Sequence, residues 1–100
     1  MSLRQKQSEF TQALGLLIAH AYYLGYELTI SDVQSLPAHR RHKKGSKHHK
    51  RLAADLNLFK DGIYLRSTEF HTPLGEYWEL IGGIWGGHFN DGNHYEWPDH

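Results

Sequence analysis

The sequence contains no cysteine, and this absence excludes several kinds of site at once. Without thiols the chain has no disulfide framework, no thiolate zinc ligand and no cysteine nucleophile. Any zinc ion in this protein must therefore be held by histidine and carboxylate side chains.

Long apolar runs are also missing. No stretch approaches the roughly 18 apolar residues of a membrane-spanning helix, so we expect no stable association with a membrane. The N-terminus lacks the basic region, apolar stretch and cleavage site of a signal peptide, which predicts synthesis in the cytoplasm without export by that route. With 100 residues the chain is long enough for one hydrophobic core but not for two.

The chain has no net charge, but its charges are unevenly distributed. Eleven Lys and Arg residues balance eleven Asp and Glu residues. Seven of the basic residues lie between Arg40 and Arg51, and four of the nine histidines lie in or beside that run. After Lys60, seven acidic residues accompany Arg66 as the single basic residue. A basic, histidine-rich centre thus precedes an acidic, aromatic C-terminal third.

Hydrophobic periodicity predicts a helix over residues 2–23, followed by Gly25 as a stop. Its predicted buried face consists of Phe10, Leu14, Leu17, Ile18, Ala21 and Tyr22. Alternating patterns predict strands over residues 26–30 and 52–59, separated by a long surface loop over residues 31–47. In the second strand Asp55 belongs to the polar face.

Turn signals organise the C-terminal half. Asp61-Gly62 predicts a hairpin that leads into a strand over residues 63–65. Pro73 is placed for the first turn of a second helix, which Gly82-Gly83 ends. A last strand is expected over residues 94–97. The predicted fold class is α+β, with two main helices around a small antiparallel sheet.

Four residues offer the chemistry of a zinc hydrolase. A catalytic zinc site takes three protein ligands and keeps one position open for water, and His48, Asp55 and His94 are candidates for those ligands. Asp91 lies three residues before His94, where a turn would direct its carboxylate toward the site as a general base. The alternative is that these are ordinary loop residues and that Asp55 pairs with Arg51. No His-Glu-x-x-His, P-loop, Gly-x-Ser-x-Gly or dinucleotide motif is present.

The same residues carry a resemblance to a known family. Residues 46–55, SKHHKRLAAD, are similar to the S-x-H-x-x-x-x-A-x-D signature of the D-Ala-D-Ala carboxypeptidase and L-alanyl-D-glutamate endopeptidase family. The similarity continues through DLNLFKDGIYL and LGEYWELIGGIWGGHFNDGNHYEW, where it resembles the small phage and prophage endolysins of that family. It spans roughly residues 29–97, and the W-G-G and D-x-x-H motifs follow in the family's order.

The resemblance implies a complete site. His48, Asp55 and His94 would bind Zn²⁺, Asp91 would be the general base, and Ser46 would lie near the ligand loop. The fold would be the α+β fold that these peptidases share with the hedgehog signalling domain. The family's upstream arginine, which stabilises the anionic intermediate, falls near Ser35, so Arg40 or Arg41 would have to replace it.

The resemblance also implies a substrate and a setting. The substrate would be the peptide stem of bacterial peptidoglycan, cut between L-Ala and D-Glu, with D-Ala-D-Ala carboxypeptidase action as the alternative. Residues 1–100 would form a single, monomeric catalytic domain with no separate wall-binding domain. It would be made in the bacterial cytoplasm and reach the wall after the inner membrane is permeabilised.

Two other interpretations remain for the charged and aromatic residues. The basic run would suit a nucleic-acid-binding protein or a metal-dependent nuclease, although the zero net charge and the lack of aromatic residues among the basic ones argue against nucleic acid. The series His88-x-x-Asp91-x-x-His94 could itself supply metal ligands.

Of the remaining histidines, His71 is interpreted as a helix cap. The tryptophans Trp78, Trp85 and Trp97 are interpreted as core residues.

Overall fold

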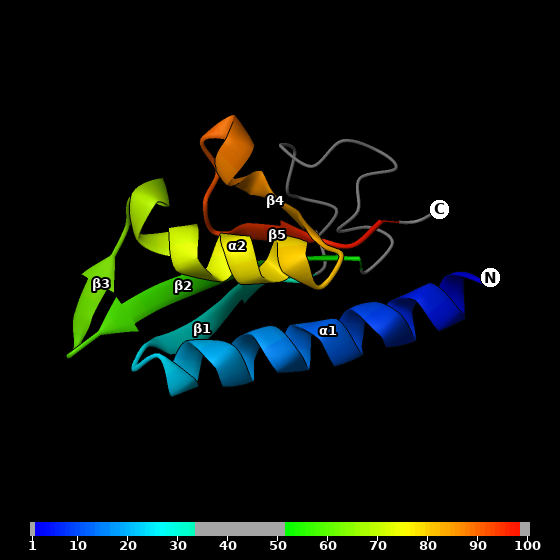
Figure 1. The fold of residues 1–100 in the computed structure, drawn as a ribbon, viewed down its shortest axis with the longest axis horizontal. Coiled ribbons are helices and arrows are strands. Elements are labelled where there is room, and N and C mark those ends of the chain that lie inside the picture. Colours follow the sequence, from blue (N-terminus) through cyan, green and yellow to red (C-terminus); the bar gives the residue numbers. More distant parts are fainter. Residues whose placement is uncertain (1, 34–51, 99–100) are drawn as a thin grey trace.

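The computed structural model describes residues 2–33 and 52–98. Two α-helices lie against one face of an open, five-stranded antiparallel sheet, and Figure 1 shows the two helices side by side. The strand order is β1-β2-β5-β4, and β3 extends the hairpin from β2. The elements in chain order are α1 (Leu3–Tyr23), β1 (Glu27–Asp32), β2 (Ala53–Lys60), β3 (Ile63–Leu65), the 3₁₀ turn Thr68–His71, α2 (Thr72–Leu80), β4 (Ile84–Trp85), the 3₁₀ turn Gly86–Phe89 and β5 (His94–Glu96).

The predicted α+β class with a small antiparallel sheet is confirmed. Helix α1 begins at a capping box, in which the Ser2 hydroxyl accepts a hydrogen bond from the Gln5 backbone and the Gln5 side chain accepts one from the Ser2 backbone. Its buried residues are Phe10, Ala13, Leu17 and Ala21. Tyr22, predicted on that face, is instead half exposed, and its hydroxyl contacts the backbone of Leu28 in β1.

The side chains of strand β2 alternate between the two faces of the sheet. Its inward residues Ala54, Leu56 and Leu58 are fully buried in the core, together with Leu52 just before the strand and Leu74 and Trp78 of α2. The intervening side chains of Asp55 and Asn57 lie on the other face and are only partly buried. This alternation matches the prediction, because side chains one residue apart in a strand point to opposite faces.

The hairpin is also confirmed. Asp61 and Gly62 both have positive φ angles, of 53° and 78°. Such angles at both central positions suit the two-residue turn whose twist matches that of the flanking strands. Strand β1 differs slightly from its prediction, since it begins at Glu27 and continues to Asp32.

The stretch between the second helix and the last strand holds more structure than its glycine-rich sequence predicts. It contains the short strand β4 and a 3₁₀ turn. The three tryptophans are core residues, as predicted: Trp78 and Trp85 are buried, and Trp97 packs edge-on against Trp78 with ring centroids 5.4 Å apart. The three tryptophans therefore serve as scaffold.

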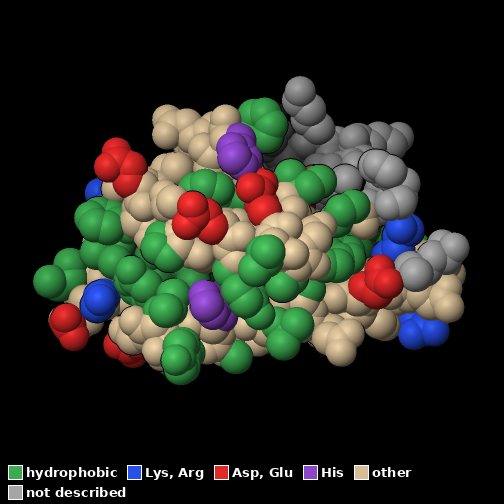
Figure 2. Space-filling view, viewed as in Figure 1, with side chains coloured by type: hydrophobic (Ala, Val, Ile, Leu, Met, Phe, Trp, Pro, Cys, Tyr) green, Lys and Arg blue, Asp and Glu red, His purple; other side chains and the backbone are tan. Residues whose placement is uncertain are grey.

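The described surface carries its acidic and basic side chains in different places. In the view of Figure 2, Lys and Arg side chains of the described residues lie at the two ends of the molecule, whereas Asp and Glu side chains also occur across its middle. In the described residues no helix combines the length and the apolar character needed to cross a membrane.

The interpretation of His71 as a helix cap is wrong. His71 occupies the N-cap position of α2, but its side chain makes no capping hydrogen bond. The ring is instead 98% buried, since only 2% of the residue is exposed, and its Nδ1 lies 2.8 Å from the Tyr95 hydroxyl. Burial lowers the pKa of His71 from 6.5 to about 4, because the charged imidazolium would lose its hydration. His71 is therefore a neutral core residue that links the start of α2 to β5.

This burial predicts a loss of stability in acid. Since the folded protein holds His71 neutral while the unfolded chain protonates it near pH 6.5, its contribution to the free energy of unfolding should fall by up to about 3 kcal/mol as pH drops from 7 through 4. Urea denaturation across this range measures the total change, and His71→Phe, which cannot take the proton, should reduce it. An NMR titration that finds the His71 ring protonating near pH 6.5 in the folded protein would contradict this prediction.

Candidate active site

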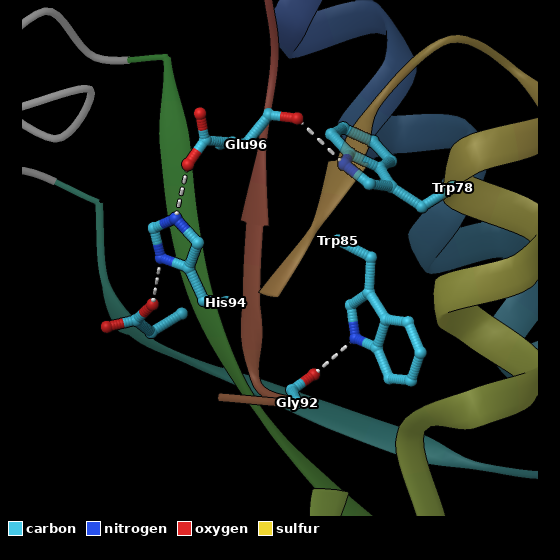
Figure 3. A network of polar contacts seen from close by, with 6 residues as sticks. Trp78, Trp85, Gly92, His94 and Glu96 are labelled. Carbon is cyan, nitrogen blue, oxygen red and sulfur yellow. Dashed lines mark hydrogen bonds and ion pairs between the residues drawn. The ribbon is translucent and has the colours of Figure 1, made fainter. Parts of the chain in front are cut away.

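Strand pairing brings two of the predicted site residues together. Strand β2 pairs antiparallel with β5, and the register sets Asp55 directly opposite His94. The Nδ1 atom of His94 lies 3.1 Å from Oδ1 of Asp55. Figure 3 shows the His94 ring on the side of β5 away from Trp78 and Trp85. These two residues, 39 apart in the sequence, thus meet on the face of the sheet opposite the core.

A second carboxylate holds the other nitrogen of the His94 ring. Its Nε2 atom lies 3.0 Å from Oε1 of Glu96, as Figure 3 shows. Burial by itself lowers the pKa of His94, but the hydrogen bonds to Asp55 and Glu96 outweigh it and raise the pKa to about 9. With this pKa the ring is a cation at neutral pH and donates to both carboxylates.

The spacing of Asp55 and His94 fits two ligands of one tetrahedral metal ion. Zinc bonds of about 2.0–2.2 Å to nitrogen and oxygen place neighbouring tetrahedral ligand atoms about 3.3–3.6 Å apart. The Nδ1 and Oδ1 atoms are 3.1 Å apart, and both donor types are ones that zinc accepts. With Nδ1 facing the metal, Nε2–H still donates to Glu96, which is the outer carboxylate partner that metal-bound histidines commonly have.

The structure does not complete this ligand set within the residues it describes. Across residues 2–33 and 52–98, no group of three or more histidine, aspartate or glutamate side chains is arranged to hold a metal ion. The third predicted ligand, His48, lies outside the described residues. Ser46, Arg40 and Arg41 lie outside them as well.

Asp91 lies in a turn that leads directly into β5. The backbone N–H of His94 donates to the carbonyl of Asp91 at 3.1 Å, and the N–H of Asp91 donates to the carbonyl of Gly86 at 2.9 Å. Asn90, just before it, adopts a left-handed conformation with φ of 60°. The Asp91 side chain is exposed. The turn itself was predicted from the Asp-Gly-Asn-His sequence and is present.

The residues before this turn form its support. The indole N–H of Trp85 donates to the carbonyl of Gly92 at 2.8 Å, as Figure 3 shows. Gly86 packs so closely that a Cβ atom there would overlap the Asp91 carbonyl oxygen and lie 2.8 Å from Cβ of His94. The Trp85 ring also fills the space beside Gly75 and Gly87. The Trp-Gly-Gly motif therefore fixes the turn that carries Asp91 and His94.

The alternative ligand series through His88 is not formed. The Nε2 atom of His88 lies 2.9 Å from Oε1 of Glu79 on α2. This hydrogen bond lowers the pKa of Glu79 below its ordinary value. His88 is therefore engaged with the helix side of the molecule rather than with Asp91 and His94.

Sequence reasoning missed Glu96. The signal was available, because residues two apart in a strand share a face and Glu96 follows His94 by two. The sequence alone did not show that the two side chains would be in contact.

Comparison with known proteins identifies the family once this geometry is established. Residues 40–97 match a protein-family model described as D-alanyl-D-alanine carboxypeptidase. The match covers more than half of the chain and includes Asp55, Asp91 and His94, so the chain belongs to this peptidase family. This family consists of hydrolases, namely peptidases that act on peptidoglycan. Its members are generally zinc-dependent. No curated protein matches the chain.

The close packing of Gly86 predicts a sensitive position. Gly86→Ala should lower the free energy of unfolding by about 1–3 kcal/mol, because the added methyl group overlaps the turn and must displace it. Gly15→Ala is the matched control, since a Cβ atom at this exposed position of α1 meets nothing within 4 Å, and it should raise stability by up to about 1 kcal/mol. Urea denaturation of both variants checks the prediction, and equal effects would contradict it.

Proposed function

We propose that this protein is a zinc peptidase that hydrolyses the stem peptides of bacterial peptidoglycan. The single observation that carries the proposal is the cross-strand pair of Asp55 and His94, whose donor atoms are 3.1 Å apart within the region that matches the family. The favoured bond is the one between L-Ala and D-Glu, and D-Ala-D-Ala carboxypeptidase action is the alternative. The family assignment and the fit of these donors to zinc support the proposal.

The proposed ligands are His48, Asp55 and His94. Zinc, when bound, supplies Lewis-acid activation of water and of the scissile carbonyl. Glu96 keeps the proton of His94 on Nε2, so that Nδ1 would be the ligand atom. The carboxylates therefore have separate tasks: Asp55 binds, and Glu96 orients.

Asp91 is the proposed general base. Its carboxylate accepts a proton from the attacking water and passes it to the amine that leaves when the peptide bond breaks. The turn supports this role, because it ties the Asp91 backbone directly to that of His94. Arg40 or Arg41 would offset the negative charge that develops on the carbonyl oxygen, and Ser46 would contact the ligand loop.

A lytic role in a phage or prophage setting completes the proposal. The protein would be made in the bacterial cytoplasm and would act as a monomer on the wall after the inner membrane is permeabilised. The alternative function is that of a nucleic-acid-binding protein or metal-dependent nuclease, which the basic run over residues 40–51 favours.

Asp91→Asn should retain zinc and lose cleavage. The amide cannot accept the proton, so turnover should fall by about 10²–10⁴-fold. The assay measures release of stem peptides from purified peptidoglycan, with and without a chelator and beside a DNA-cleavage reaction. Asp61→Asn is the matched control, because it makes the same change in the exposed hairpin turn and should leave activity unchanged.

The outcomes of this assay separate the two functions. Chelator-sensitive peptide release supports the peptidase, and mass spectrometry of the fragments identifies the bond that is cut. Zinc-loaded protein that cleaves DNA and releases no peptide would support the nuclease instead. Full activity of Asp91→Asn would remove Asp91 from the role of base.

Metal binding provides an independent prediction. His94→Ala should lose stoichiometric zinc, because it removes a ligand. Glu96→Ala should weaken zinc binding by about 10–100-fold, since the ring loses the partner that fixes its orientation. Glu96→Gln keeps an acceptor oxygen and should lose less zinc affinity than Glu96→Ala. Competition titration with a zinc indicator measures each affinity, and Glu76→Ala, at an exposed position on α2, is the control. Unchanged affinity in Glu96→Ala would contradict the orienting role.

A further inference from the structure

A polar pocket of about 210 Å³ lies beside the proposed base. One wall comes from the β3 side and includes Tyr64, Arg66 and Thr68, and the other comes from the loop before β5 and includes Asn90, Asp91 and Asn93. The pocket therefore adjoins the turn that carries the proposed catalytic residues, and neither the family assignment nor the motif residues gives it a role.

The two walls are fixed to each other. The backbone N–H of Gly92 donates to the Thr68 hydroxyl at 3.1 Å, across 24 residues of sequence. A Cβ atom at Gly92 would lie 2.6 Å from the Thr68 Cα, so this contact depends on glycine. The N–H of Leu56 in β2 donates to the carbonyl of Asn93 at 2.8 Å. The pocket is thus preformed, and a ligand would not have to order its walls.

Arg66 is the cation of this pocket. It is the single Lys or Arg after Lys60 in the sequence, and its side chain is exposed. Within residues 2–33 and 52–98 the ion pairs are those of His88 with Glu79 and of His94 with Asp55 and Glu96, so Arg66 takes part in none of them. His71 also lines the pocket, but burial lowers the pKa of His71 to about 4 and leaves that ring uncharged at neutral pH. The guanidinium therefore provides the positive charge among the described lining residues.

We propose that this pocket is the subsite for a free carboxylate on the residue that follows the scissile bond, with Arg66 as its counter-ion. A guanidinium binds a carboxylate through two parallel N–H donors, which gives both affinity and orientation. The inference rests on the proposed function and deepens it by assigning a specificity-determining residue.

The chemistry of both candidate bonds leads to the same ligand group. After a cut between L-Ala and D-Glu, the residue on the far side is D-Glu, which has two carboxyl groups and uses one of them to continue the chain. After a cut between two D-Ala residues, the residue on the far side carries the C-terminal carboxylate. In either case an anion follows the scissile bond, and an arginine beside the proposed base matches it.

The test uses two synthetic stem peptides that differ at one group. In one peptide the residue after the scissile bond has a free carboxylate, and in the other this group is an amide. Arg66→Gln should lower kcat/KM for the carboxylate peptide by about 10–100-fold, mostly through KM, because one charge-assisted contact is lost. The same variant should change kcat/KM for the amide peptide by less than about threefold.

Two further variants complete the design. Arg66→Lys keeps the charge but not the paired donors, so it should restore part of the loss. Arg4→Gln, which removes an exposed arginine from α1, should cleave both peptides as the parent does. Because Arg66 is exposed, each variant should unfold at the same urea concentration as the parent, and this measurement is made first.

The results distinguish this inference from the proposed function. The subsite assignment is wrong, and the peptidase assignment stands, if the parent protein cleaves peptidoglycan but Arg66→Gln does not discriminate between the peptides. This means that kcat/KM falls equally for both peptides or is unchanged for both. If the parent protein cleaves neither peptide nor intact peptidoglycan with zinc bound, the proposed function is wrong and the subsite falls with it.

Discussion

The antiparallel register between β2 and β5 is the constraint on which both the core and the site depend. It sets Ala54 opposite Tyr95 on the inner face and Asp55 opposite His94 on the outer face. A slip of one residue would exchange the faces, because the side-chain period of a strand is two. It would expose the fully buried Tyr95 and drive charged groups into the core. The hydrophobic burial that stabilises the sheet therefore also selects the pairing of the proposed ligands.

Tryptophans and backbone hydrogen bonds hold this register at both ends of β5. Beyond the last paired residue, the N–H of Trp97 donates to the carbonyl of Leu52 at 2.7 Å. The indole N–H of Trp78 donates to the carbonyl of Glu96 at 2.9 Å, and that of Trp85 anchors Gly92 on the other side of His94 (Figure 3). A buried indole needs a partner for its single donor. Here that need is met by the backbone that flanks the site, so the aromatic core also positions the functional strand.

The outer face of the sheet is organised around a cation. Asp55 and Glu96 both face the ring of His94, and their hydrogen bonds and negative charges favour the protonated form of that ring. These contacts outweigh the effect of burial and raise the pKa of His94 to about 9. A metal ligand must be deprotonated, so metal binding would release this proton. The two carboxylates thus stabilise the protonated ring, whereas in the proposed metal site Asp55 would bind the metal and Glu96 would orient the ring.

The sequence by itself predicted several elements and local turns, because these depend on neighbours within a few residues. They are the first helix, expected over residues 2–23 and found over residues 3–23, the alternation of β2, the Asp61-Gly62 hairpin and the turn from Asp91 to His94. It also identified Asp55 and His94 as candidates through residue chemistry and family motifs, although periodicity did not fix their contact. Tertiary structure alone decided the burial of His71 against Tyr95, the contact of His94 with Glu96, and the placement of Arg66 and Asp91 in the lining of one pocket. The physical reason is that sequence patterns report the local backbone and the face of each side chain. Which faces meet is set by packing the whole sheet against its two helices.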